Sequence, residues 1–200
     1  MKKENLISTV WPFKMDEVHP YAFWENALTK EECEKIIKIS KEDKLKRAKV
    51  RNEIENQKFN IRDSHISWIY PQDDRLASIF QKISGYVNNL NDRFFKFDLY
   101  GLIEGFQFTN YKAPGGHYGC HVDTSHTRYI RKLSIVIQLT DPKKYKGGEL
   151  KLYFDDKGTI INNSQGFLCL FPSYVLHKVE PVTKGERNSL VGWVTGPNFK

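Results

Sequence analysis

The sequence predicts an α+β fold that is mainly β, with two helices preceding a jelly roll or sandwich of short strands. Apolar residues recur at helical spacing in the first half, whereas from Phe94 onward the period is two and turn residues separate the runs. No strands alternate with helices, which disfavours a Rossmann-type sheet. The length of 200 residues suits a single domain with one core.

Two helices are expected in the first half of the chain. Thr29 and Glu32 form a capping box, and the apolar residues that follow predict a helix over about 30–41. Asp74 is expected to cap a second helix, whose apolar stripe continues to Leu90. We interpret both helices as cover for the core.

The segment between these helices, 44–62, is dense in charge and poor in large apolar residues. This composition predicts a mobile loop, and both a solvated loop and a functional lid remain open as interpretations. His65 to Tyr70 is expected to form an edge strand that closes the loop.

Short strands account for most of the second half. They are expected at 94–99, 105–111, 133–139, 149–154, 159–162, 166–171, 176–179 and 189–194. About eight short strands in one hundred residues are typical of a jelly roll or sandwich.

Composition limits the environment in which the protein works. The three cysteines, Cys33, Cys120 and Cys169, are far apart and form no CxxC pair, which favours reduced thiols in a cytoplasmic protein. No apolar run is long enough for a signal sequence or a membrane span, so no membrane partner is expected. The net charge of +7 is a weak pointer to an acidic or phosphate-bearing partner, because charges of both signs are dispersed.

His121 and Asp123 are separated by one residue, so on an extended strand their side chains project to the same face. This pattern alone often arises by chance. His177, on a later predicted strand, supplies a second imidazole. Two imidazoles and one carboxylate are the facial ligand set of non-haem iron(II), which leaves coordination positions open, whereas a structural zinc site would need four closed ligands.

Arg187 lies ten residues beyond His177. Its guanidinium could bind a carboxylate bidentately and so anchor a dicarboxylate whose other end chelates the metal. An ordinary surface charge after the turn at 184–185 is the alternative. Trp193 shares the strand parity of Arg187, so the two are expected to point the same way.

These residues belong to a longer ordered pattern. It consists of Tyr111, His121-Val122-Asp123, a strand at 133–139, Gly147-Gly148-Glu149-Leu150, Phe171-Pro172 followed by His177, and Arg187. From about Phe106 to Trp193 the chain therefore resembles the iron(II)- and 2-oxoglutarate-dependent dioxygenases, specifically their prolyl 4-hydroxylase-like branch.

The resemblance implies a double-stranded β-helix (jelly-roll) core with the N-terminal helices packed on its outer sheet. Residues 1–200 would form a single dioxygenase domain, with helical cover over 1–93, including the loop at about 44–62, and the jelly-roll core over 94–200.

The resemblance also implies the roles of individual residues. His121, Asp123 and His177 would bind Fe(II), and Tyr111 and Arg187 would hold the distal carboxylate of 2-oxoglutarate. No catalytic residue is expected beyond the metal site.

Three further residues, Tyr118, Arg131 and Trp193, match positions that face the peptide substrate in some relatives. Gln138 is a departure, because certain relatives carry a second tyrosine there.

The implied activity is hydroxylation of an unactivated C–H bond with 2-oxoglutarate and O2 as co-substrates, succinate and CO2 as co-products, and ascorbate as an optional further cofactor. A prolyl residue in a peptide or protein is the first expectation for the substrate. The alternatives are a free amino acid or other small molecule, oxidative dealkylation of nucleic acid, and a metal-free binding module that retains the barrel.

Overall fold

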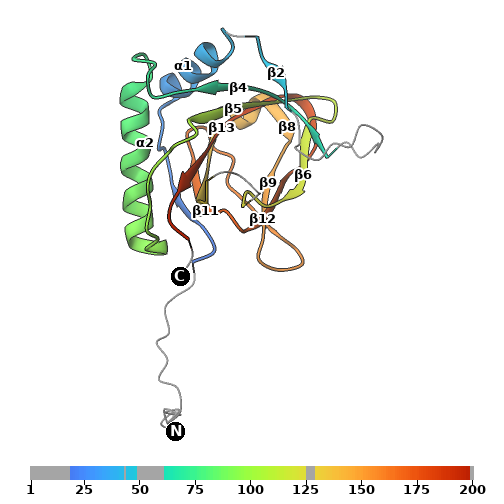
Figure 1. Cartoon of the computed structure of the whole chain (residues 1–200). Helices are drawn as coiled ribbons and strands as arrows, with labels where there is room; N and C mark the ends of the chain where they lie inside the picture. The colour runs from blue at the N-terminus through green and yellow to red at the C-terminus, as the bar shows by residue number, and fades with distance from the viewer. Residues whose placement is uncertain (1–18, 43, 49–60, 125–128, 199–200) are drawn as a thin grey trace, which may run out of the picture.

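Two antiparallel sheets and two helices make up the computed structural model, which describes residues 19–42, 44–48, 61–124 and 129–198 (Figure 1). The sheets pack face to face as a jelly roll, and both helices lie outside the larger sheet (Figure 1). The predicted fold class is therefore confirmed. Within the described ranges, no helix is both long and apolar enough to cross a membrane.

The larger sheet has eight strands, and its hydrogen-bonded neighbours all run antiparallel. In spatial order they are β1 (Ala22–Trp24), β11 (Leu168–Pro172), β7 (Arg131–Gln138), β13 (Val182–Thr195), β5 (Phe106–Lys112), β4 (His65–Ile69) and β2 (Lys46–Arg47), with β8 (Tyr145–Gly147) paired to the beginning of β13.

The smaller sheet has five strands, in the order β10 (Thr159–Ile160), β9 (Leu150–Tyr153), β12 (Leu176–Val179), β6 (His117–His121) and β3 (Arg62–Asp63). Strands β1 to β4 precede residue 94, so the N-terminal part of the chain adds strands to both sheets as well as helices.

The first helix follows the sequence prediction closely. Helix α1 spans Lys30–Ser40, the Thr29 hydroxyl accepts from the backbone N–H of Glu32 at 3.2 Å, and the Glu32 carboxylate accepts from the backbone N–H of Thr29 at 2.8 Å. The capping box thus satisfies two of the backbone donors that a helix N-terminus leaves without partners.

The second helix ends at Leu90 as predicted but begins later than expected. Helix α2 spans Ala77–Leu90 and begins after Leu76 without a side-chain cap, so the expected cap at Asp74 is wrong. The strand expected at 94–99 is also absent, because the chain continues into the π-helical turn η1 (Asn91–Phe95). The Asn91 amide binds both the N–H and the carbonyl of Phe97, which gives this segment the partners that a strand would otherwise supply.

The segment before β4 is described only in part. The strand at His65–Ile69 is confirmed, but β4 lies between β5 and β2 rather than at the edge of the sheet. Residues 49–60, the middle of the expected loop, lie outside the described residues, and the proposal of a lid at 44–62 stays a prediction.

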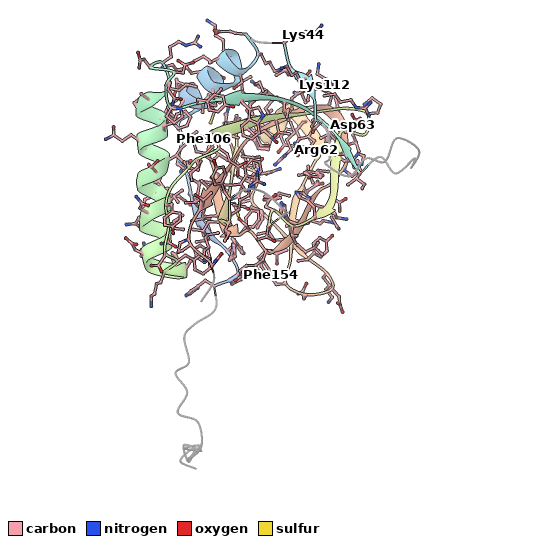
Figure 2. All side chains as sticks on the ribbon, viewed as in Figure 1. Lys44, Arg62, Asp63, Phe106, Lys112 and Phe154 are labelled. Carbon is pink, nitrogen blue, oxygen red and sulfur yellow. The ribbon has the colours of Figure 1, made fainter. Side chains whose placement is uncertain are left out.

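Side chains along β5 point alternately into the hydrophobic core and into a cavity between the two sheets. Phe106 and Phe108 are buried against the two helices, and Phe106 lies on the side of α2 (Figure 2). Gln107, Thr109 and Tyr111 project to the opposite face, between the sheets, where they line a cavity. One strand therefore contributes both to the hydrophobic core and to a polar interior.

Candidate metal and co-substrate site

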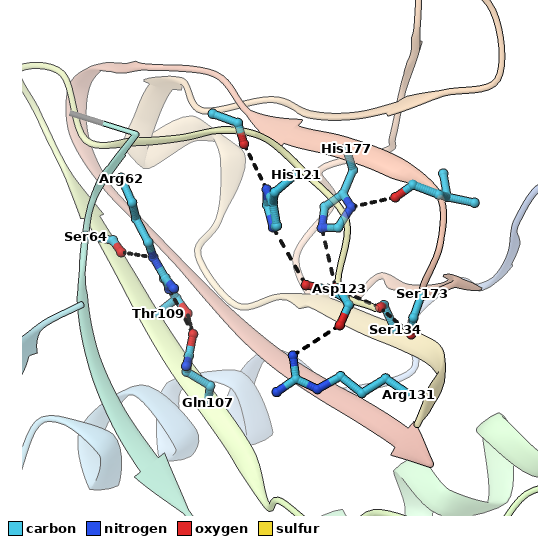
Figure 3. A network of polar contacts seen from close by, with 12 residues as sticks. Arg62, Ser64, Gln107, Thr109, His121, Asp123, Arg131, Ser134, Ser173 and His177 are labelled. Carbon is cyan, nitrogen blue, oxygen red and sulfur yellow. Dashed lines mark hydrogen bonds and ion pairs between the residues drawn. The ribbon is translucent and has the colours of Figure 1, made fainter. Parts of the chain in front are cut away.

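Three candidate metal ligands lie close together where strand β6 of the smaller sheet ends (Figure 3). His121 on β6 and His177 on β12 are direct cross-strand partners, and their ring centroids are 4.1 Å apart. Asp123 follows β6, and its backbone N–H donates to the carbonyl of Ser173 at 2.9 Å. Pairing of the two strands therefore brings His177 together with residues 56 and 54 positions earlier in the sequence, and the ligand atoms of the three lie within 4.8 Å of one another.

The backbone determines which nitrogen each imidazole presents. His121 Nδ1 bonds the carbonyl of Gly119 at 2.8 Å, and His177 Nδ1 bonds the carbonyl of Val175 at 2.9 Å. Because a carbonyl oxygen can only accept, each Nδ1 carries the proton and each Nε2 keeps its lone pair. The Nε2 atoms lie 3.7 and 3.5 Å from the two carboxylate oxygens of Asp123.

The charge states in this cluster suit a divalent cation. Burial, reinforced by the neighbouring His177, lowers the pKa of His121 to about 4, so this imidazole is neutral near pH 7. The pKa of Asp123 lies below its usual range although burial raises it, and the 2.7 Å hydrogen bond from the Ser134 hydroxyl favours the ionised carboxylate. Neutral imidazole nitrogens and an ionised carboxylate are the forms that bind iron(II), so these three residues fit that ion.

The ligand cluster opens into a cavity of about 310 Å³ between the two sheets. Tyr111 and Arg187 line it together with the three ligands. Its aliphatic lining comes from Val122, Val136, Leu150, Val179 and Val191. A polar set of groups in an apolar cavity of this size is typical of a small-molecule site.

Arg187 is almost completely buried, at 1% exposure, and lies directly opposite Tyr111 in the β13–β5 ladder. Its Nη2 donates to the side-chain oxygen of Gln138 at 2.9 Å, while its Nε has no hydrogen-bond partner. No carboxylate of the described residues pairs with it. A buried cation with unused donors is a fitting receptor for a carboxylate, so the surface-charge interpretation of Arg187 is wrong.

Gln138 occupies the position where the expected second tyrosine is missing. Its carbonyl oxygen holds the guanidinium of Arg187, and the side chain is itself buried. Gln138, which departs from the family pattern, therefore orients Arg187, the arginine that is expected to bind the co-substrate.

The three expected substrate-facing residues line the same cavity. Tyr118 stacks on His121, with ring centroids 3.6 Å apart. The guanidinium of Arg131 lies 3.8 Å from the centroid of the Trp193 ring and binds both carboxylate oxygens of Glu104. Arg131 is therefore neutralised within the described chain.

Sequence reasoning missed several polar residues of the cavity and its support. Ser134, which holds Asp123, and Glu104, which pairs with Arg131, carried no motif of their own. Gln107 and Thr109 could have been found from their alternation with phenylalanines on β5. Arg62 lies on a two-residue strand within a charged segment, which gives no periodic signal.

The fold and the site define a double-stranded β-helix with a His-x-Asp…His centre and a buried arginine in the same cavity. Residues 106–195 match the model of the 2OG-Fe(II) oxygenase superfamily. Curated relatives share this similarity, and solved prolyl hydroxylase structures share the fold.

Curated relatives match over the same part of the chain. A PKHD-type hydroxylase of Prochlorococcus marinus (strain NATL2A) is 40% identical over 99 residues, which cover 49% of this chain and 44% of that protein. A PKHD-type hydroxylase of Pseudoalteromonas atlantica is 34% identical over 124 residues, covering 58% and 52% of the two chains. The chain thus spans about half the length of the curated relatives it matches.

Solved structures with the same fold cover nearly the whole chain. A Pseudomonas putida prolyl-4-hydroxylase is similar with a TM-score of 0.68 and 24% identity, over 90% of this chain and 94% of that one. A Trichoplax adhaerens prolyl hydroxylase, in complex with a hypoxia inducible factor peptide fragment, gives a TM-score of 0.73 and 18% identity over 88% and 84% of the chains. At these identities the likeness establishes the fold.

Proposed function

We propose that this protein is an Fe(II)- and 2-oxoglutarate-dependent dioxygenase that hydroxylates an unactivated C–H bond. One observation carries the proposal: His121, Asp123 and His177 form an iron-compatible ligand cluster in the same cavity as Arg187, a buried cation that no described carboxylate pairs with. A metal with open positions and a receptor for the far end of a dicarboxylate are the two parts that such chemistry needs.

Each side chain has a definable role in this proposal. When bound, iron would couple the reaction of dioxygen with 2-oxoglutarate, which gives succinate and CO2, to oxidation of the substrate. Arg187 binds the distal carboxylate of the co-substrate, Gln138 holds the guanidinium in place, and Tyr111 lies beside it with 5.4 Å from its ring centroid to the Arg187 Cζ. The apolar side chains of the lining keep water away from the reacting groups.

We also propose that the chain acts as one domain across residues 1–200, because its early strands join both sheets. The three cysteines are free, and two of them are buried, which supports a reducing, cytoplasmic setting.

The proposed substrate is a prolyl residue of a peptide or protein, with Tyr118, Arg131 and Trp193 as lining residues. The proposal is supported by the fold shared with two proteins named prolyl hydroxylases, one of them in complex with a peptide fragment. The curated relatives are named PKHD-type hydroxylases, which agrees with the proposed hydroxylation.

The test is turnover by the purified chain supplied with Fe(II), 2-oxoglutarate, O2 and ascorbate. Succinate is measured by mass spectrometry, and a library of proline-containing peptides is searched for a gain of about 16 Da, the mass of one added oxygen atom. The matched control is Asp123→Ala, which removes the only anionic ligand of the cluster. Undiminished succinate from that variant would reject the iron site, and modified free amino acids without modified peptides would reject the peptide substrate.

A further inference from the structure

A third arginine lines the cavity on the side that faces the candidate metal ligands (Figure 3). Arg62, on β3, is 9% exposed. Its Nε donates to the Ser64 hydroxyl at 2.8 Å, and its Nη2 donates to the side-chain oxygen of Gln107 at 2.8 Å. The guanidinium is therefore held in a fixed orientation by two neutral groups.

The neutrality of these partners matters, because the other arginines of the cavity have charge partners in the proposed enzyme. Glu104 neutralises Arg131. Fe(II) contributes two positive charges and Arg187 one, and these are balanced by Asp123 and the two carboxylates of 2-oxoglutarate. No carboxylate of the described residues pairs with Arg62. The loaded cavity therefore keeps one buried positive charge that neither the described chain nor the co-substrate neutralises.

The position of this charge relates it to the substrate. The guanidinium of Arg62 lies 4.4 Å from the centroid of the Tyr118 ring, and the same ring stacks on His121. Arg62, Tyr118 and a candidate metal ligand thus form one continuous stack. The bonds to Ser64 and Gln107 occupy two of the five N–H donors of the guanidinium, so others can bind a ligand in the cavity.

We propose that Arg62 is a specificity-determining residue that binds a carboxylate of the substrate close to the carbon that is hydroxylated. This inference rests on the proposed function and adds to it a chemical class: the substrate is anionic near its reactive carbon. The carboxylate can belong to an acidic side chain beside the target residue or to the α-carboxylate of a free amino acid or chain end. Buried charged hydrogen bonds discriminate strongly against a neutral analogue, because the arginine would then remain unpaired.

The experiment compares matched pairs of substrates with the wild-type chain loaded with Fe(II) and 2-oxoglutarate. One arm uses proline peptides that carry Asp or Asn, and Glu or Gln, at the positions flanking the proline; the other uses free proline and prolinamide. We expect kcat/KM for the carboxylate member to exceed that of its amide by about ten- to hundredfold in at least one arm. The arm that shows the preference identifies the source of the carboxylate.

Three variants connect the preference to Arg62. Gln107→Glu keeps the shape of its side chain but places a carboxylate at the 2.8 Å contact, and it is expected to reduce the preference to within about threefold, a difference too small for a charged hydrogen bond. Arg62→Gln is expected to do the same. Lys112→Gln removes one positive charge from an exposed site that pairs with Glu186, and should retain the preference. Thermal denaturation confirms that each variant is folded.

The outcomes separate this inference from the function on which it rests. Succinate formation without any difference between acid and amide members, whether both are modified or neither is, would overturn the role of Arg62 and leave the dioxygenase proposal intact. Absence of succinate with every substrate would reject the proposed function itself. A preference that survives Gln107→Glu would show that another residue recognises the carboxylate.

Discussion

Replacing Arg187 with methionine separates the stability of the protein from its capacity to bind 2-oxoglutarate. The side chain is 1% exposed, has one hydrogen bond of good length, to Gln138, and leaves its Nε without a partner. In the free protein this is a buried charge whose desolvation is poorly compensated. Methionine fills much of the same volume without the charge.

The expected magnitudes differ for the two properties. Leaving the Gln138 oxygen unpaired costs about 1–3 kcal/mol, whereas removing the buried charge returns a similar amount. The free energy of unfolding should therefore change by no more than about 2 kcal/mol. Loss of a buried bidentate contact to a carboxylate costs about 2–5 kcal/mol, which weakens co-substrate affinity about thirty- to four-thousandfold.

Urea denaturation measures the first quantity, and calorimetric titration of the metal-loaded protein with 2-oxoglutarate measures the second. Metal binding should persist, because Arg187 is not among the clustered ligands. Unchanged affinity for 2-oxoglutarate would refute the assignment of Arg187 as the carboxylate receptor. A loss of stability well above 2 kcal/mol, with metal affinity also lost, would show that the arginine is mainly structural.

Three further predictions test the support of the site and the fold. Ser134→Ala removes the 2.7 Å hydrogen bond to Asp123 and should weaken metal affinity about ten- to hundredfold in equilibrium dialysis, and equal affinity would contradict this. At pH 8 a thiol reagent should label the exposed Cys120 quickly in the folded protein, whereas Cys33, whose pKa burial raises to about 12, should react only after denaturation; rapid labelling of Cys33 would disprove its burial. Thr29→Ala removes the capping box of α1 and should lower the free energy of unfolding by about 1 kcal/mol in urea denaturation, and an unchanged midpoint would show that the cap does not stabilise the protein.

The candidate ligands could be predicted because each rests on a local rule. His121 and Asp123 share a face through their spacing, and His177 lies on a strand that alternation predicts. Their convergence depends on the pairing of β6 with β12, for which the sequence offered only the family resemblance. The prediction of Arg187 and Trp193 on one face also followed from strand parity, and both line the cavity.

The remaining features depend on tertiary contacts that a linear pattern does not encode. The expected strand at 94–99 was wrong because the Asn91 side chain binds the backbone of Phe97. Arg62 was missed because a strand of two residues has no period, and its burial comes from packing against Tyr118 and Gln107. Such residues become visible only when distant strands are placed side by side.

The central claim is that His121, Asp123 and His177 hold the iron at which 2-oxoglutarate is consumed. The most direct measurement combines iron content with succinate formation in the wild-type protein and in Asp123→Ala. The account predicts one iron per wild-type chain and iron-dependent succinate formation, with turnover abolished in the variant. Succinate formation by the variant at the wild-type rate, or a wild-type chain that binds no iron, would contradict it.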